Sequence, residues 1–198
     1  MIEDFIHNLT LIQIIGTGFG IAQVLLARKN KISNYLFGIV SILLGFWVHY
    51  QTQLYADILL GMYYLVMSVY GYVYWRYGKK NKPSPITYST KQDYIKAGLI
   101  VVICFSIMVY WLGNHTDSDV VIWDSIISAF AWAGMWLMAR RKIENWVFLN
   151  ISNFIAIPLL IYKELYIYAG LTLFLFIVAI SGYIEWRNII KTRKEEDE

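Results

Sequence analysis

Seven long apolar stretches constrain this chain more than any other feature of its sequence. A helix that crosses a lipid bilayer needs about 17–25 predominantly apolar residues, and the second, fourth and sixth stretches are at the short end of that range. Their continuous apolar character predicts helices rather than the alternating strands of a membrane barrel. We therefore expect an all-helical integral membrane protein with spans over residues 9–27, 35–50, 54–75, 97–113, 120–139, 146–162 and 165–186.

The bulk composition indicates the same class. Hydrophobic residues make up 58% of the 198 residues and charged residues 16%, whereas soluble domains carry about 45–50% and about 25%. The net charge of +3 does not indicate nucleic-acid binding, because the basic residues follow the membrane layout described next.

Lysine and arginine residues fall almost entirely on one side of the predicted membrane layout. With the N-terminus outside and seven spans, 16 of the 17 basic residues share one face, and Lys163 lies opposite. Loops rich in Lys and Arg stay in the cytoplasm. The distribution predicts a multi-pass inner-membrane protein with its N-terminus outside and its C-terminus in the cytoplasm.

The chain contains an internal repeat. When the sequence is shifted by 111 residues, segment 31–76 aligns without a gap on segment 142–187, and 12 of 46 pairs are identical. Polar residues match at both ends of the segment, which is harder to obtain by chance than a match of apolar residues. The identical pairs include Lys31/Lys142, Asn34/Asn145, Ser41/Ser152, Gly71/Gly182 and Trp75/Trp186.

The repeat predicts an organisation of three, one and three helices. Within one membrane domain over residues 1–198, we expect a first bundle over 9–77, a linker helix over 97–113 and a second bundle over 120–187. Residues 188–198 are expected to form a cytoplasmic tail, of which the mixed-charge run 191–198 is expected to be disordered. Three spans and one linker return the chain to its starting side, so the two bundles share one orientation. Such parallel repeats form substrate sites at their interface near the middle of the bilayer.

Polar residues in the sixth apolar stretch are the first candidates for a substrate site. Trp146, Asn150 and Asn153 are spaced by four and three residues, which places them on one helix face. Pro158 follows and leaves the carbonyl of Phe154 without its helical donor. Buried amides suit a substrate with several hydroxyl groups. The alternatives are hydrogen bonds between helices for the asparagines and a membrane-interface anchor for Trp146.

Two carboxylates lie just inside the outer ends of predicted spans. Asp57 and Asp124 are intramembrane ionisable residues, which are functional candidates by default, and here they would attract or gate a cationic substrate. Tyr64 shares the helix face of Asp57, and Ser128 shares that of Asp124. The competing interpretation is a structural hydrogen bond in the outer leaflet.

Aromatic residues offer surfaces that stack on a substrate ring or face a cation. Trp47 and Tyr64 belong to this group, and core packing is the alternative for each. Trp75, Trp111, Trp146 and Trp186 lie at predicted span ends, a position typical of headgroup anchors. The sequence shows no catalytic, nucleotide-binding or paired metal-ligand motif, so we expect neither an enzyme nor a cofactor or metal site.

Longer motifs resemble one family of bacterial vitamin transporters. The run Arg140-Arg-Lys-Ile-Glu-Asn-Trp146, followed by Asn153 and Ile157-Pro-Leu159, resembles the sixth-span signature of the PnuC family. The runs Tyr70-Gly-Tyr-Val-Tyr-Trp75 and Gly182-Tyr-Ile-Glu-Trp186 resemble the ends of its third and seventh spans. The likeness covers about residues 16 to 187.

The resemblance implies a fold akin to that of the SWEET sugar transporters and facilitated uptake of nicotinamide riboside by alternating access. A cytoplasmic kinase is expected to phosphorylate the vitamin and trap it, which supplies NAD biosynthesis. Trp146 and Asn153 match the family's Trp-x-x-Trp-x-x-x-Asn motif, but Leu149 replaces the second Trp. Ser41 stands where many members have Asn, and Gly61 where some have Gln.

Because of these departures, other substrates and another class of function remain open. Thiamine, riboflavin or a deoxynucleoside are the alternative substrates within the family. A substrate-binding subunit or scaffold of a larger complex is the alternative from a different class. The sequence also leaves a homo-oligomer open.

Overall fold

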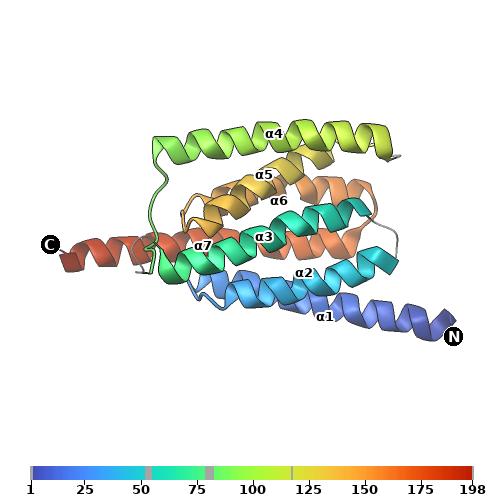
Figure 1. Ribbon diagram of the computed structural model, residues 1–198, viewed down its shortest axis with the longest axis horizontal. Coiled ribbons are helices and arrows are strands. Elements are labelled where there is room, and N and C mark those ends of the chain that lie inside the picture. Colours follow the sequence, from blue (N-terminus) through green and yellow to red (C-terminus); the bar gives the residue numbers. More distant parts are fainter. Residues whose placement is uncertain (1, 52–54, 79–82, 117, 198) are drawn as a thin grey trace. The chain divides into compact units, whose positions relative to one another are not determined.

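The computed structural model describes residues 2–51, 55–78, 83–116 and 118–197, which are almost entirely helical (Figure 1). Two compact units follow one another along the chain, unit one over Met1–Ser84 and unit two over Pro85–Glu198. Unit one holds α1 (Ile2–Arg28), α2 (Asn34–Gln51) and α3 (Tyr55–Tyr77). Unit two holds α4 (Lys91–His115), α5 (Val121–Ala139), α6 (Asn145–Tyr162) and α7 (Tyr166–Asp197).

The helices have the length and composition of membrane spans. Five of those in the described residues, namely α1, α4, α5, α6 and α7, are long and apolar enough to cross a bilayer. The other two, α2 and α3, occupy predicted spans and contain polar residues near their ends or along their length. Helix α2 ends with His49 and Gln51, and α3 is rich in tyrosine. The chain is an all-helical, multi-pass membrane protein, as predicted.

Unit one is held together by α2, which packs against both α1 and α3. The ring of Tyr35 meets that of Trp75 edge to face, with centroids 5.1 Å apart at 87°. Gly71 makes room for this contact, because a Cβ there would lie 2.4 Å from the Tyr35 ring. On the other side of α2, Ser41 Oγ donates a 2.7 Å hydrogen bond to the carbonyl of Gly16.

Unit two repeats each of these contacts 111 residues further along. Trp146 and Trp186 also meet edge to face, with centroids 5.6 Å apart at 84°. A Cβ on Gly182 would lie 2.7 Å from the Trp146 ring. Ser152 Oγ donates a 2.8 Å hydrogen bond to the carbonyl of Ile127. The sequence repeat is therefore also a repeat of tertiary contacts within each unit.

Three of the four predicted headgroup anchors are in fact core residues, and the fourth, Trp111, is half-buried. Trp75, Trp146 and Trp186 are each at most 1% exposed, so the prediction from their position at span ends was wrong. The reason is a glycine one turn before each of Trp75 and Trp186. Because glycine has no side chain, the partner ring from the neighbouring helix lies directly against the backbone beside the tryptophan. Edge-to-face aromatic pairs are a favoured geometry beyond the area they bury.

The two units differ in one packing contact at equivalent positions. In unit one, the side chain of Gln23 on α1 lies over Gly38 on α2, where a Cβ would meet it at 2.7 Å. In unit two, the glycine is instead on α5, the repeat equivalent of α1. Leu149 on α6 lies over Gly134 on α5, where an added Cβ would meet the Leu149 side chain at 2.8 Å. A large residue faces a small one in both cases, but the helices have exchanged roles.

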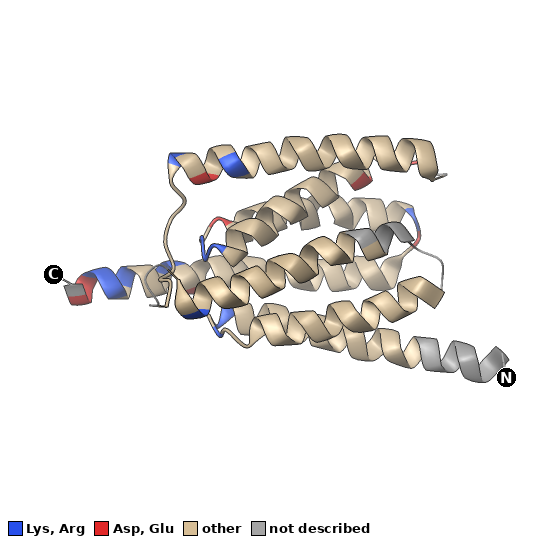
Figure 2. Cartoon of the chain, viewed as in Figure 1, with Lys and Arg blue, Asp and Glu red and all other residues tan. Residues whose placement is uncertain are grey.

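Basic residues gather at one end of each unit (Figure 2). In unit one they lie at the turn from α1 to α2 and at the end of α3, and in unit two at the start of α4, the turn from α5 to α6 and the end of α7. Lys163 lies at the other end of unit two, at the turn from α6 to α7. The clustering of charge predicted from the sequence thus holds within each unit.

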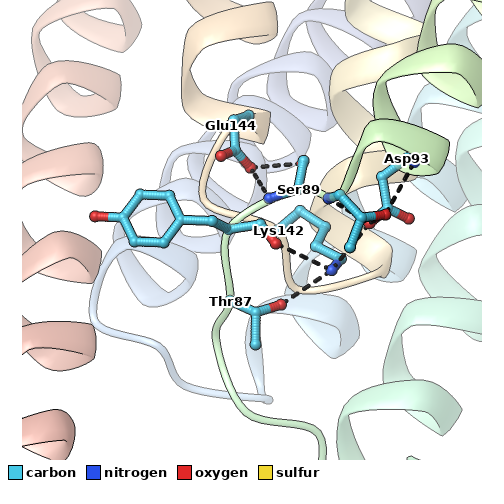
Figure 3. Close-up of polar contacts among 7 residues, drawn as sticks. Thr87, Ser89, Asp93, Lys142 and Glu144 are labelled. Atoms are coloured by element: carbon cyan, nitrogen blue, oxygen red, sulfur yellow. Dashed lines mark hydrogen bonds and ion pairs between the residues drawn. The ribbon is translucent and has the colours of Figure 1, made fainter.

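An extended segment, residues 85–90, fastens the start of α4 to the basic end of unit two; we call it the strap (Figure 3). Its Thr87 pairs in parallel with the turn between α5 and α6, through a bond from Thr87 N to Arg141 O of 3.2 Å and one from Ile143 N to Thr87 O of 3.1 Å. Arg141 adopts a left-handed φ of 57°, a conformation that side chains other than glycine rarely take. The strap bonds therefore stabilise a strained turn.

Charged side chains complete the strap contacts. Lys142 Nζ lies 3.1 Å from Asp93 Oδ2 and donates to Thr87 Oγ1 at 3.0 Å. Ser89 donates to Glu144 Oε2 from both its backbone nitrogen, at 2.8 Å, and its hydroxyl, at 2.5 Å. Figure 3 shows these side chains converging from α4, the strap and the turn before α6.

The C-terminal segment is ordered rather than disordered. Helix α7 continues to Asp197, about ten residues beyond the predicted end of its span. Arg193 donates from Nη2 to the carbonyl of Ile86 in the strap at 2.8 Å. This bond explains the difference, because a mixed-charge sequence that is expected to be disordered alone gains a tertiary partner here.

Candidate substrate-binding groove

A groove of about 640 Å³ lies between α6 and α7 of unit two. Most of its wall is apolar, and Asn150, Trp146 and Tyr183 are the lining residues that carry a polar side-chain group. Substrate pockets typically combine a largely apolar wall with a few placed polar groups. The lining residues are Trp146, Val147, Asn150, Ile151, Phe154, Ile155, Phe176, Ala179, Ile180, Tyr183 and Ile184.

Two residues that line this groove each carry a buried polar atom without a hydrogen-bond partner in the described structure. These atoms are Trp146 Nε1, a donor, and Asn150 Oδ1, an acceptor. The two residues lie one helical turn apart on α6, as the spacing predicted. A buried polar group without a partner costs on the order of 1–3 kcal/mol. A ligand that accepts from Trp146 and donates to Asn150 would recover that cost.

The groove favours a ring-bearing ligand without a phosphate group. Its lining residues include no Lys or Arg, and a phosphate placed in an apolar site without cationic partners carries a large desolvation cost. The aromatic residues Phe154, Phe176 and Tyr183 offer faces and edges to a ring. The groove therefore suits a small aromatic molecule with hydroxyl or amide groups.

Asn153 and Leu149 lie on other sides of α6. Asn153 is half-buried and is not among the residues that line the groove. Leu149 packs against Gly134 on α5, so the residue that replaces the motif's second Trp faces the neighbouring helix. Of the three predicted residues on α6, the structure brings Trp146 and Asn150 together on the groove, and Asn153 stays a candidate.

Asp124 contributes to a charged cluster at the end of unit two opposite the basic residues. Its Oδ2 accepts from Ser118 Oγ at 3.3 Å and lies 3.7 Å from Lys163 Nζ. Lys163 also lies 3.8 Å from Asp119 Oδ1. Ser128, one turn further along α5, is half-buried. The ion pair supports the structural interpretation of Asp124 without testing a contact with substrate.

The predicted site residues of unit one, as far as the structure describes them, make separate contacts. Ser41 bonds to the backbone of α1, as described above, and Trp47 is 54% exposed. Tyr64 is half-buried and meets Tyr63 edge to face at 5.8 Å. The side chain of Asp57 lies outside the described residues.

Sequence reasoning did not identify the α7 wall of the groove. Phe176 and Tyr183 face Asn150 and Trp146 across it, but they lie in a continuous apolar run with no polar landmark. One signal was present, because Gly182 and Trp186 are retained in the repeat and mark the place where α6 and α7 pack most closely.

Comparison with known proteins places the chain in a family. A family model described as nicotinamide mononucleotide transporter matches residues 10–188. The chain belongs to this family of membrane transporters. The match covers all seven helices, and the predicted transporter is thereby confirmed.

Curated relatives of this transporter family are named nicotinamide riboside transporter PnuC. The protein from Escherichia coli (strain K12) is 26% identical over 213 residues, which cover 94% of this chain and 89% of the relative. The protein from Neisseria mucosa is 28% identical over 190 residues, which cover 87% and 70%. The predicted resemblance to the PnuC family is confirmed.

A solved structure shows the same fold. The crystal structure described as that of the vitamin B3 transporter PnuC superposes with a TM-score of 0.72 and 22% sequence identity. The superposition covers 92% of this chain and 83% of that chain. The similarity supports the all-helical transporter fold of the family.

Proposed function

We propose that this chain carries nicotinamide riboside across the membrane by facilitated diffusion. The observation that carries the proposal is the match, over 94% of this chain, to a relative named as a transporter of that nucleoside. The groove between α6 and α7 supports it independently, because an unpaired indole donor and an unpaired amide acceptor stand on an aromatic wall.

The nucleoside is a better candidate than the mononucleotide in the family description. A phosphate would require lysine or arginine partners, and the stretches 97–139 and 164–186 contain neither residue. The groove wall has none either. Charges without partners are strongly disfavoured at the centre of a membrane protein. The positive ring of the nucleoside, in contrast, is delocalised and suits aromatic faces.

The mechanism we infer is alternating access between two like-oriented three-helix bundles, residues 9–77 and 120–187, that form one membrane domain with the linker helix 97–113. Because loops rich in Lys and Arg stay in the cytoplasm, the basic end of each unit is the cytoplasmic end in a bacterial inner membrane. The N-terminus is then outside and the C-terminus inside. Phosphorylation by a cytoplasmic kinase would trap the vitamin after uptake.

Uptake into proteoliposomes that contain this chain alone tests the proposal. We expect accumulation of labelled nicotinamide riboside to equilibrium, with little uptake of nicotinamide mononucleotide or thiamine. Enclosing a nicotinamide riboside kinase and ATP in the vesicles should raise accumulation above equilibrium. Uptake of thiamine but not nicotinamide riboside would overturn the substrate assignment. Dependence on a co-purifying ATPase would instead indicate a subunit of a larger complex.

A further inference from the structure

A second groove, of about 520 Å³, lies between the start of α5 and the end of α6. We call it the outer groove, because it lies at the end of unit two away from the basic residues. Asp119 and Trp123 line it from the α5 side, and Pro158 and Tyr162 line it from α6. Phe154 lines both this groove and the one between α6 and α7. The two grooves therefore adjoin along α6.

The mouth of the outer groove carries net negative charge. Lys163 is shared between the carboxylates of Asp119 and Asp124, at 3.8 and 3.7 Å, and Glu164 follows it in the chain. One ammonium is therefore shared by two carboxylates, which leaves a net negative charge in this part of the described structure. The side chain of Asp119 is 67% exposed, so it is accessible to a second cation.

Aromatic rings stand beside this carboxylate. Trp123 is 54% exposed and Tyr162 71% exposed, and both line the groove. An aromatic face attracts an organic cation most strongly when the ring is that of Trp. The combination of exposed rings and a carboxylate complements a positively charged aromatic molecule, whereas a lipid tail would gain nothing from Asp119.

A proline interrupts the backbone hydrogen bonds of α6 at the outer groove. Pro158 lies inside α6 and has no N–H, so it cannot donate to the carbonyl of Phe154 four residues earlier. Both residues line the outer groove. An amide or hydroxyl group of a ligand is able to supply the missing donor. The site thus combines attraction for a cation with a partner for a polar hydrogen.

We propose that the outer groove is a docking site for small aromatic cations that bear hydrogen-bond donors, from which they pass along α6 to the groove beside Asn150. The distance from Tyr162 to Asn150 along α6 is about 18 Å at 1.5 Å per residue. This inference rests on the proposed function, in which nicotinamide riboside has the required pyridinium ring, amide and hydroxyl groups. The site acts before the unpaired groups of Trp146 and Asn150 engage the ligand.

Initial uptake rates in intact bacterial cells that express the full chain test the docking site. The two key variants are Asp119→Asn and Glu164→Gln, which each remove one negative charge from the same end of unit two, but only Asp119 lines the groove. We expect Asp119→Asn to raise the KM for nicotinamide riboside about 5-fold at unchanged maximal rate, because a carboxylate contact with a cation is lost. Glu164→Gln should change it less than about 2-fold.

Replacement of the aromatic wall separates a ring contact from general charge attraction. Trp123→Leu should raise the KM for nicotinamide riboside. Trp123→Tyr should keep the KM close to the wild-type value, because an aromatic face remains. The neutral, reduced form of nicotinamide riboside should be insensitive to Asp119→Asn.

Three outcomes overturn the docking site. Equal effects of Asp119→Asn and Glu164→Gln would indicate attraction by net charge alone. An unchanged KM in Asp119→Asn and Trp123→Leu would show that the groove is not on the route, while transport itself would stand. A wild-type chain that carries no nicotinamide riboside would overturn the proposed function together with the site.

Discussion

The buried ion pair at the strap gives the sharpest prediction of stability. Lys142 and Asp93 are 3.1 Å apart, and their side chains are only 11% and 8% exposed. We consider the substitution Lys142→Met, which keeps most of the aliphatic chain and removes the charge. The variant leaves the Asp93 carboxylate buried without its cation and also removes the bonds from Lys142 to Thr87 and to the carbonyl of Tyr88.

The magnitude follows from the burial of the pair. Removing one partner of a buried ion pair costs roughly 3–5 kcal/mol, and a chain of this size loses about 2–4 °C of melting temperature per kcal/mol. Because Asp93 keeps its capping bonds with Thr90, we place Lys142→Met near the lower limit, about 3 kcal/mol and a loss of roughly 6–12 °C.

The chain supplies its own reporter and control. Cys104 is the single cysteine and is buried in α4, so a fluorogenic thiol reagent reports the unfolding of unit two in detergent. Lys31→Met is the matched control, because Lys31 is the repeat equivalent of Lys142 but is exposed. The control should unfold within about 2 °C of wild type, since surface substitutions cost little.

A double variant tests the cause of the loss. In Lys142→Met with Asp93→Asn, the buried charge disappears while the capping geometry is kept, so the variant should recover at least about 1 kcal/mol relative to Lys142→Met. Equal melting temperatures for Lys142→Met and Lys31→Met would refute the reasoning. A double variant less stable than Lys142→Met would also refute it, because the carboxylate would then not be the source of the cost.

Three further predictions concern helix packing and the site. Gly182→Ala should lower thermal stability by about 1–3 kcal/mol, because its Cβ would lie 2.7 Å from the Trp146 ring, whereas Gly170→Ala, which meets nothing within 4 Å, should be neutral in the same thiol assay. Asn150→Ala should abolish nicotinamide riboside binding, measured by calorimetry, and leave the melting temperature unchanged; wild-type affinity would remove Asn150 from the site. Asp57→Asn should weaken binding of the cationic nucleoside more than that of its neutral reduced form, and equal effects would assign Asp57 a structural role.

Part of the candidate site could be predicted from the sequence of one helix, and part of it could not. The spacing of Trp146, Asn150 and Asn153 predicted one shared helix face; Trp146 and Asn150 line the same groove, whereas Asn153 does not. The opposite wall, with Phe176 and Tyr183, was not predicted, because an apolar residue that faces a ligand and one that faces lipid have the same hydropathy. Leu149 shows the same limit, since its contact with Gly134 depends on the neighbouring helix.

The sequence by itself determined the membrane class, the order of helices, the repeat and the separation of charge, because hydropathy, helix length and loop charge act locally along the chain. The tertiary structure alone decided that Trp75, Trp146 and Trp186 are core residues and that α7 stays helical to Asp197. It also decided the strap, whose Ser89 and Glu144 are 55 residues apart. Such contacts join segments that each have several possible partners, and only the packed fold brings the right atoms within bonding distance.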